Sequence, residues 1–265
     1  MNGGIWDRAA AGYERTGVDF FAPLGRELVA RAGLRPGDRV LDVGTGRGHV
    51  LLPAAAAVGG TGRVTGVDLS PAMVELTAAD LAARGLAHAT VRVGDAAAPG
   101  LAPASVDAVL AGFMLFLLPD PAAALRSYRS ALVPGGRLAA SSYGPPDPRA
   151  EEARRRLRRR AGLGADVPDV FDDPAALAAM VAAAGFTDVV VDDVAVAVRF
   201  RDAGQWWDWA WSVGYRGALE RIAPADLPAA RAAVAEALAP ARQADGTLVI
   251  TTGARFTTAL AARTA

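Results

Sequence analysis

The residues best able to do chemistry gather in one short segment, residues 40–49, with the sequence VLDVGTGRGH. Three glycines alternate in it: Gly44, Gly46 and Gly48. Glycines allow a tight turn and let backbone amides approach a ligand without interference from a Cβ atom. A dinucleotide-binding turn needs the pattern G-x-G-x-x-G, whose last glycine would fall at His49. Asp42, two residues before the first glycine, would repel a pyrophosphate and favours a ligand that carries a positive charge.

Two further aspartates follow expected strands. Asp68 ends the segment VTGVD, about 20 residues after the loop, where a carboxylate can accept hydrogen bonds from both ribose hydroxyls. Asp95 follows the third expected strand, where an adenine ring would lie. Each aspartate taken alone could simply cap a loop or a helix. In order with Asp42 and the glycines, they predict a nucleoside-type ligand with a cationic group.

Two residues are candidate catalytic groups. His49 is expected to open the helix after the glycine loop, where the helix N-terminus would keep the imidazole neutral and able to accept a proton. The alternative is that His49 only packs or forms a hydrogen bond near the loop. Tyr143 ends the fifth expected strand at the same edge of the sheet and is a candidate for contact with the substrate.

These residues need a parallel sheet to bring them together, and the chain alternates strand and helix patterns from about Arg39 onward. Strands are expected at residues 39–43, 63–67, 90–93, 106–111, 137–142, 189–200 and 248–252. Helices are expected at 48–58, 71–84, 121–132 and 174–184, with two more in an insertion at 202–245 and a closing segment at 254–263.

Aromatic and apolar residues form a separate group of candidates. Trp207, Trp211 and Tyr215 are spaced i, i+4 and i+8, which would place them on one helical face. They either line a substrate pocket or dock the inserted helix onto the sheet. Further candidates for apolar pocket walls are Phe20, Phe21, Phe113, Met114 and Phe116.

Composition excludes several classes of function. The chain of 265 residues has no Cys, and all 28 basic residues are Arg, so thiolate, Schiff-base and P-loop lysine chemistry have no residue to use. With only two His, a three-histidine zinc site cannot form, and no metal site is expected. The net charge of zero disfavours nucleic-acid binding, so the run RRRLRRR at 154–160 is interpreted as a solvated helix face.

No membrane partner is expected either. The longest apolar run, Val109–Leu118, is too short to span a bilayer, and the N-terminus lacks the apolar core of a signal peptide. A cytoplasmic protein with a small-molecule substrate is therefore predicted. The sequence does not predict the oligomeric state.

The ordered motifs resemble those of the class I S-adenosylmethionine-dependent methyltransferases, and most closely the ubiquinone/menaquinone-biosynthesis-type branch with its relatives in bacterial natural-product pathways. The segments that carry the resemblance are VLDVGTGRG (40–48), VTGVDLSPAMV (64–74), VGDA (93–96), SVDAVLAGFMLFLLPD (105–120) and LVPGGRLAASSYG (132–144). The resemblance implies an α/β Rossmann-like fold with a seven-stranded, mostly parallel sheet in the order 3-2-1-4-5-7-6, the last strand antiparallel, and helices on both faces.

The resemblance also implies the cofactor S-adenosyl-L-methionine. The glycines would line it, Asp68 would bind its ribose, Asp95 with Ala96 would hold its adenine, and Tyr13 would be a lid residue. The stretch 111–114 would face the methionine part and the substrate. The expected cofactor-binding set is Tyr13, Asp42, Gly44, Thr45, Gly46, Gly48, Asp68, Leu69, Asp95, Ala96 and Ala111.

The expected organisation is a helical lid segment (1–34), a cofactor-binding core (35–200) and a helical insertion with a closing strand (201–265). The predicted activity is methyl transfer to O, N or C of a hydrophobic, secondary-metabolite-like molecule. Two alternatives stay open: a cyclase of the same fold that binds the cofactor without transferring methyl, and a non-catalytic binding protein.

Overall fold

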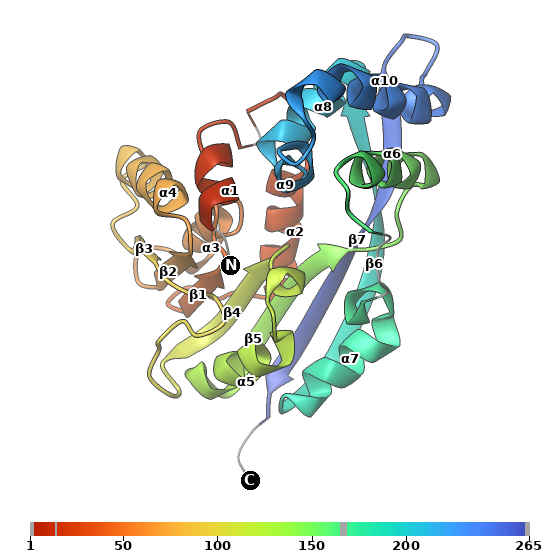
Figure 1. Cartoon of the computed structure of the whole chain (residues 1–265). Helices are drawn as coiled ribbons and strands as arrows, with labels where there is room; N and C mark the ends of the chain where they lie inside the picture. The colour runs from red at the N-terminus through yellow and green to blue at the C-terminus, as the bar shows by residue number, and fades with distance from the viewer. Residues whose placement is uncertain (1–2, 14, 165–168, 263–265) are drawn as a thin grey trace.

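The computed structural model describes residues 3–13, 15–164 and 169–262, and it contains one seven-stranded sheet (Figure 1). The strand order is β3-β2-β1-β4-β5-β7-β6. Strand β7 runs antiparallel to both β5 and β6, whereas the other pairs are parallel. The predicted fold class and strand order are therefore confirmed. The strands are β1 (Arg39–Val43), β2 (Arg63–Asp68), β3 (Ala89–Val93), β4 (Val106–Gly112), β5 (Leu132–Tyr143), β6 (Phe186–Phe200) and β7 (Leu248–Ala261).

Helices cover both faces of the sheet. Figure 1 shows α5 and α7 on the viewer's side, with α2 and α3 on the other side. Leu28 of α2 and Ala54 of α3 belong to one buried apolar cluster, and Leu125 of α5 and Leu177 of α7 belong to a second. The helices are α1 (Gly3–Ala9), α2 (Phe21–Ala32), α3 (Leu51–Val58), α4 (Pro71–Ala83), α5 (Pro121–Ala131), α6 (Pro148–Arg160), α7 (Pro174–Ala183), α8 (Ala203–Ser212), α9 (Arg216–Leu219) and α10 (Leu227–Leu238).

Local sequence explains where the helices begin. Ser70 caps α4 by accepting a hydrogen bond from the Met73 N–H, and Pro71 occupies the first turn, where no N–H is needed. Helix α3 begins at Leu51 rather than at Gly48 as expected, because Gly46 and Gly48 have φ values of 51° and 78°, which no α-helix accommodates.

The last strand is longer than expected. Residues 248–252 and 254–263 were predicted as a strand and a separate closing segment, but β7 runs without a break from Leu248 to Ala261. It pairs with β5 through seven positions and with almost the whole of β6. The break expected near Gly253 does not occur, because this glycine lets β7 pass close to Pro145, whose nitrogen would lie 2.6 Å from an added Cβ.

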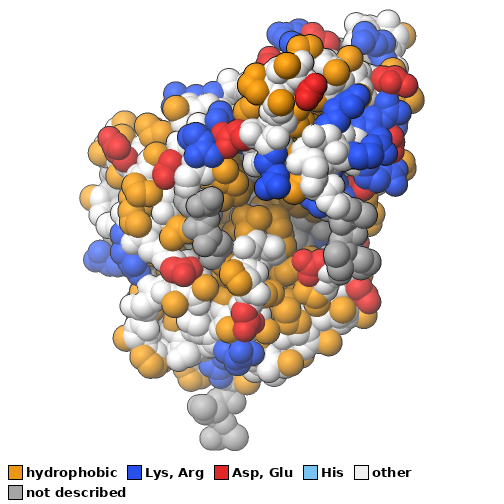
Figure 2. Space-filling view, in the orientation of Figure 1, with side chains coloured by type: hydrophobic (Ala, Val, Ile, Leu, Met, Phe, Trp, Pro, Cys, Tyr) orange, Lys and Arg blue, Asp and Glu red, His pale blue; other side chains and the backbone are white. Residues whose placement is uncertain are grey.

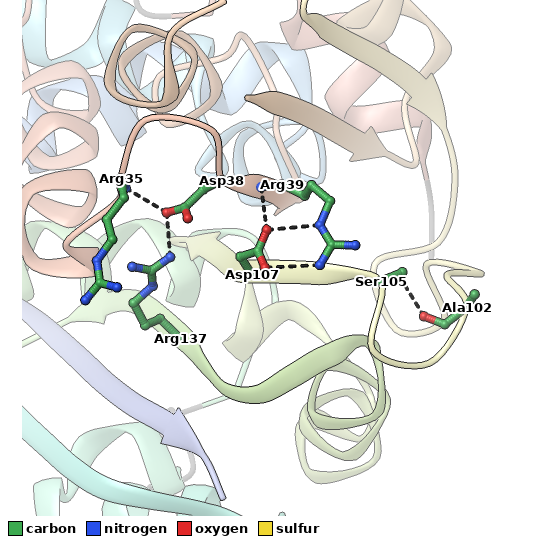
Figure 3. Close-up of polar contacts among 7 residues, drawn as sticks. All are labelled: Arg35, Asp38, Arg39, Ala102, Ser105, Asp107 and Arg137. Carbon is green, nitrogen blue, oxygen red and sulfur yellow. Dashed lines mark hydrogen bonds and ion pairs between the residues drawn. The ribbon is translucent and has the colours of Figure 1, made fainter. Parts of the chain in front are cut away.

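The amino-terminal edge of the sheet is held together by ion pairs (Figure 3). Asp107 in β4 accepts hydrogen bonds from the Arg39 backbone N–H at 2.8 Å and from its Nε at 3.0 Å. Arg137 in β5 pairs with Asp38, which precedes β1. These contacts join β1, β4 and β5 at the amino-terminal edge. The glycine loop lies at the opposite, carboxyl edge, where open α/β sheets bind their ligands.

Helix α1 lies above the carboxyl edge, between α4 on one side and α8 and α9 on the other (Figure 1). Asp7 of α1 accepts a hydrogen bond from the Ala72 N–H at the start of α4. Arg8 of α1 donates to Glu220, which follows α9, with an Nε–Oε1 distance of 2.8 Å. Helix α1 thereby bridges the two sides of the molecule. The division into lid, core and insertion stays a prediction.

Helix α6 carries the arginine-rich run, which appears with neighbouring basic side chains as a blue group in Figure 2. Arg154 pairs with Glu151, and Arg156 pairs with both Glu152 and Glu236. Ion pairing within the helix and with α10 agrees with a solvated face. Among the described residues, no helix is both long enough and apolar enough to cross a membrane.

Candidate functional site

A cavity of about 310 Å³ opens at the carboxyl edge of the sheet. Hydrophobic side chains line a hollow in the middle of the face shown in Figure 2. The lining comes from the ends of five adjacent strands: Asp95 after β3, Asp68 at the end of β2, Asp42 in β1, Gly112 in β4 and Ser141 in β5. Because these strands are neighbours in the order β3-β2-β1-β4-β5, the cavity runs across the sheet. Helices α1 and α2 complete its walls.

The glycine loop is shaped by an aspartate of the next strand. The Asp68 carboxylate accepts hydrogen bonds from the Gly46 N–H at 2.8 Å and from the Ser70 N–H at 2.9 Å. Gly44 has a φ of 65°, and an added Cβ there would lie 2.8 Å from the Cβ of Met114. Only glycine fits this position, because the loop after β1 approaches the segment after β4 so closely.

Asp42 is a buried carboxyl group with one short hydrogen bond. Its side chain accepts from the Thr45 hydroxyl at 2.6 Å, and the residue is 1% exposed. The pKa of Asp42 is raised to about 7, mainly by burial and in smaller part by the nearby charge of Asp68. Burial likewise raises the pKa of Asp68. A buried acid in this state is stabilised as a carboxylate by a ligand that brings a positive charge.

His49 lies in the turn before α3, and it lines the cavity. The pKa of His49 is lowered to about 4, mainly by burial and in smaller part by the charge of Arg47. The imidazole is therefore neutral near pH 7, as expected. The main cause is burial rather than a position within a helix, because α3 begins only at Leu51. Its ring centroid is 6.1 Å from that of Tyr13. Gly25 of α2 packs on the His49 carbonyl oxygen, which would lie 2.2 Å from an added Cβ.

The far half of the cavity is apolar. Phe113, Met114 and Leu117 follow β4, and Phe21 faces them from α2, with its ring centroid 5.3 Å from that of Phe113. Phe113 has a φ of 51°, a conformation that costs a bulky residue about 1–3 kcal/mol. Its N–H donates to the Ser141 carbonyl oxygen at 3.0 Å and to the Ser141 Oγ at 3.2 Å, which holds the residue in this conformation.

Many residues of the predicted site meet around this one cavity. Those that line it are Tyr13, Phe21, Asp42, Gly44, Thr45, Gly46, His49, Asp68, Leu69, Asp95, Ala96, Phe113 and Met114. Two predicted cofactor-binding residues face elsewhere. Ala111 is fully buried in the core, so its neighbour Gly112 lines the cavity instead. Gly48 allows close packing on α4, where an added Cβ would lie 3.3 Å from Thr77.

The predicted face of three aromatic residues is wrong. Helix α8 ends at Ser212, so Tyr215 lies beyond it and contacts Trp206 and Trp209 with centroid distances of 5.6 and 5.9 Å. Trp207 is buried in the main core, and Trp211 packs against the guanidinium of Arg216. Trp207, Trp211 and Tyr215 all lie outside the cavity lining. These three residues therefore pack the helices after β6 rather than line the cavity.

A second layer of rings supports the cavity wall. Tyr143 lies outside the lining and is 45% exposed, and its ring contacts Phe113 at 5.1 Å and Phe116 at 5.4 Å. Phe20 is buried behind Phe21, with centroids 4.8 Å apart. Tyr143, Phe20 and Phe116 therefore back the residues that line the cavity, and a direct role for Tyr143 in catalysis stays a prediction.

Several lining residues carried no clear signal in the sequence. They are Ile5, Trp6, Gly25, Arg47, Val50, Met73, Leu117, Leu118 and Ser141. Ile5 and Trp6 come from α1, which is far in sequence from the sheet. Spacing gives no signal for them, because α1 ends at Ala9 and Tyr13 lies beyond it.

Comparisons with known proteins agree with this arrangement. The family described as "Methyltransferase domain" matches residues 40–136. The chain is 37% identical over 236 residues to the nocamycin O-methyltransferase of Saccharothrix syringae, covering 83% of this chain and 84% of that protein. It is 42% identical over 137 residues to the aklanonic acid methyltransferase DauC of Streptomyces sp. strain C5, covering 52% and 62%. The crystal structure of the [4+2]-cyclase SpnF has a similar fold, with a TM-score of 0.59 at 22% identity over 92% of this chain and 82% of that one.

Proposed function

Because the chain belongs to the class I S-adenosylmethionine-dependent methyltransferases, we propose that it methylates an oxygen atom of a hydrophobic small molecule. The observation that carries the proposal is the division of the cavity into an acidic half and an apolar half with His49 at the loop between them. The name of the nocamycin O-methyltransferase favours oxygen as the acceptor.

The acidic half fits the cofactor. Asp42, Asp68 and Asp95 line the cavity at the ends of β1, β2 and β3. S-adenosylmethionine, when bound, supplies an electrophilic methyl group on a sulfonium. We assign Asp68 to the ribose hydroxyls, Asp95 with Ala96 to the adenine, and Asp42 to the amino group. The buried carboxyl of Asp42 supports this assignment, since a cation stabilises its charged form.

The apolar half fits the acceptor molecule. Phe21, Phe113 and Met114 form walls that exclude water and hold a hydrophobic molecule against the loop after β1. Methyl transfer is a direct displacement, so alignment of the acceptor contributes much of the rate enhancement, about 7–11 kcal/mol where the fit is good. In this proposal Phe113 sets the position of the acceptor, because its N–H is held by two oxygens of Ser141.

His49 is the proposed general base. A base must be unprotonated at the working pH, and burial keeps the pKa of His49 at about 4. It can therefore accept the proton of an acceptor hydroxyl as the new O–C bond forms. Tyr13 and Phe21 stack on each other beside it, which limits the access of water to the imidazole.

We further propose that α1 and the helices after β6 form the lid of this site. Ile5 and Trp6 of α1 line the cavity. The pair of Arg8 with Glu220 joins α1 to the insertion, and the contact of Asp7 with Ser70 joins it to α4. A lid held at both sides would exclude water during transfer.

The test compares two histidine variants, since the chain has only His49 and His88. The purified protein is incubated with S-adenosylmethionine and a panel of hydrophobic phenols, and S-adenosylhomocysteine is quantified. We expect His49→Gln to lower kcat by about 10²–10⁴-fold while the Kd for S-adenosylhomocysteine stays within about threefold. His88→Gln is the matched control, because His88 bonds to the Ala55 carbonyl oxygen, outside the cavity lining.

Two results would contradict the proposal. An unchanged kcat in His49→Gln would show that His49 is not the general base. Conversion of an acceptor without formation of S-adenosylhomocysteine would indicate a cyclase of the same fold.

A further inference from the structure

Ser141 brings a hydroxyl group into the apolar half of the cavity. Among the described lining residues, β4, β5 and the segment after β4 contribute Gly112, Phe113, Met114, Leu117, Leu118 and Ser141. Ser141 is the only one of these six with a polar side chain, and it is 3% exposed. A buried polar group has a hydrogen-bond partner in the protein or is prepared for one in a ligand.

The Ser141 side chain lies on the cavity side of the sheet. Ser141 is the register partner of Gly112, so the two residues point to the same face. An added Cβ at Gly112 would lie 2.7 Å from Val50 and 3.8 Å from Leu28 of α2, which identifies this face as the one that α2 covers. The Ser141 Oγ itself lies 3.2 Å from the backbone nitrogen of Phe113, a residue that lines the cavity.

The Ser141 hydroxyl still has a hydrogen to donate. A hydroxyl group offers one donor and two acceptor sites. The Phe113 N–H uses one acceptor site, and within the described residues no atom accepts the hydroxyl hydrogen. The other aliphatic hydroxyl of the lining, that of Thr45, already donates to Asp42 at 2.6 Å. A buried donor without an acceptor costs stability, so the Ser141 hydroxyl is prepared for an oxygen of a ligand.

This hydroxyl and the proposed base lie near one another at the end of β4. Val50, which directly follows His49, is the side chain that an added Cβ at Gly112 would meet first, and Gly112 is paired with Ser141. His49 and Ser141 therefore approach the same small region of the cavity. A ligand that gives a proton to His49 and accepts one hydrogen bond from Ser141 must carry its two oxygens close together.

We propose that the Ser141 hydroxyl donates a hydrogen bond to a carbonyl oxygen of the acceptor, and that the protein prefers acceptors whose carbonyl group is attached to the carbon next to the one that bears the hydroxyl. Ortho-acyl phenols and enolised 1,3-dicarbonyl compounds share this arrangement. The inference rests on the proposed function, because the acceptor must occupy the apolar half of the cavity. Ser141 then determines specificity, since a second anchored oxygen fixes the reacting hydroxyl relative to the methyl group.

The test measures binding of the acceptor, without turnover, in protein saturated with S-adenosylhomocysteine. Isothermal titration calorimetry compares 2-acetyl-1-naphthol, which carries the carbonyl, with 2-ethyl-1-naphthol, which lacks it. The ratio of the two Kd values isolates the contribution of the carbonyl. We expect Ser141→Ala to lower the preference for the acetyl compound by about 3–10-fold, the range of a hydrogen bond between neutral groups. Ser141→Thr keeps a hydroxyl and therefore keeps the preference.

Ser142→Ala is the matched control. Ser142 follows Ser141 in the same strand and is equally buried, but its side chain points to the opposite face, toward Leu177 and Val181 of α7 and outside the cavity lining. The control removes the same atom and leaves the preference unchanged. The wall persists in Ser141→Ala, because the Phe113 N–H still donates to the Ser141 carbonyl oxygen at 3.0 Å.

The proposal is overturned if Ser141→Ala keeps the wild-type ratio of Kd values, since the hydroxyl would then act only in the structure of the wall. An equal loss of preference in Ser142→Ala also overturns it. A wild-type protein that binds S-adenosylhomocysteine but neither naphthol would instead refute the placement of the acceptor in the apolar half, so failure of this inference and failure of the proposed function are distinguishable.

Discussion

Replacing Asp42 with asparagine should make the ligand-free protein more stable at alkaline pH and less able to bind the cofactor. Asp42 is 1% exposed, and burial raises its pKa from 3.8 to about 7. A difference of about three pKa units corresponds to about 4 kcal/mol, at roughly 1.4 kcal/mol per unit. That is the free energy by which the buried charge destabilises the folded state once the carboxyl is ionised.

The direction of the pH dependence follows from the raised pKa. The folded protein binds the proton of Asp42 more tightly than the unfolded chain does, so the stability from this group is fully present below about pH 4. It is lost as the pH rises from there through the folded pKa of about 7. Asparagine does not ionise, so Asp42→Asn should exceed the wild-type protein in free energy of unfolding by about 1–2 kcal/mol at pH 5 and by up to about 4 kcal/mol at pH 8.5.

Urea unfolding of the ligand-free proteins at both pH values measures this difference. Comparing variant with wild type cancels the contribution of His49, whose lowered pKa acts in the opposite direction. Asp208→Asn, at an exposed position of α8, is the control and should change neither value. The Kd for S-adenosylmethionine should rise at least about tenfold in Asp42→Asn, because the ammonium loses its charged partner. Equal gains in stability at pH 5 and pH 8.5 would refute the reasoning.

The remaining predictions concern the base and the walls of the cavity. Gly25→Ala should lower kcat, because the new Cβ would lie 2.2 Å from the His49 carbonyl oxygen and displace this residue. Gly60→Ala is the control and should leave kcat unchanged, because no atom lies within 4 Å of its Cβ. Steady-state kinetics of the two variants tests this. At saturating cofactor, kcat should stay level from about pH 8 to about pH 5, since burial keeps the pKa of His49 at about 4; a pH profile with a midpoint near 6.5 would contradict this. Trp206→Ala should cost about 3–5 kcal/mol of stability in denaturant titration with an unchanged KM, because this ring is 2% exposed and outside the cavity lining. Phe113→Ala should raise the KM for the acceptor about tenfold, because Phe113 lines the cavity. A raised KM in Trp206→Ala together with an unchanged KM in Phe113→Ala would contradict both assignments.

Sequence reasoning was most successful where the chemistry of a position depends on its immediate neighbours. Asp42, Gly44 and Asp68 each follow or end a short apolar strand, and parallel strands deliver their carboxyl ends to one edge. The strand order itself came from the resemblance to a family, because periodicity alone does not specify which strands are neighbours.

Prediction failed where tertiary packing decides the outcome. The spacing of Trp207, Trp211 and Tyr215 describes one face of a continuous helix, but α8 ends at Ser212 and the chain turns back on itself. Trp6 reaches the cavity only because α1 packs on α4 and α9, contacts that no local pattern contains. The same limit applies to Arg47, whose burial depends on α1 and α4 covering it.

The pKa values of Asp42 and His49, two buried groups of the cavity, are shifted in opposite directions. This difference lets the proposed site serve both ligand binding and proton transfer. Burial raises the pKa of Asp42 and lowers that of His49, so both groups tend toward their neutral forms in the ligand-free protein. A cationic cofactor favours ionised Asp42, because opposite charges attract. The same cation disfavours protonated His49, as Arg47 already does. In the proposed function, binding of the cofactor therefore stabilises the negative charge in the acidic half and keeps His49, the proposed base, unprotonated beside the apolar half, which is the charge state that methyl transfer to a hydroxyl requires.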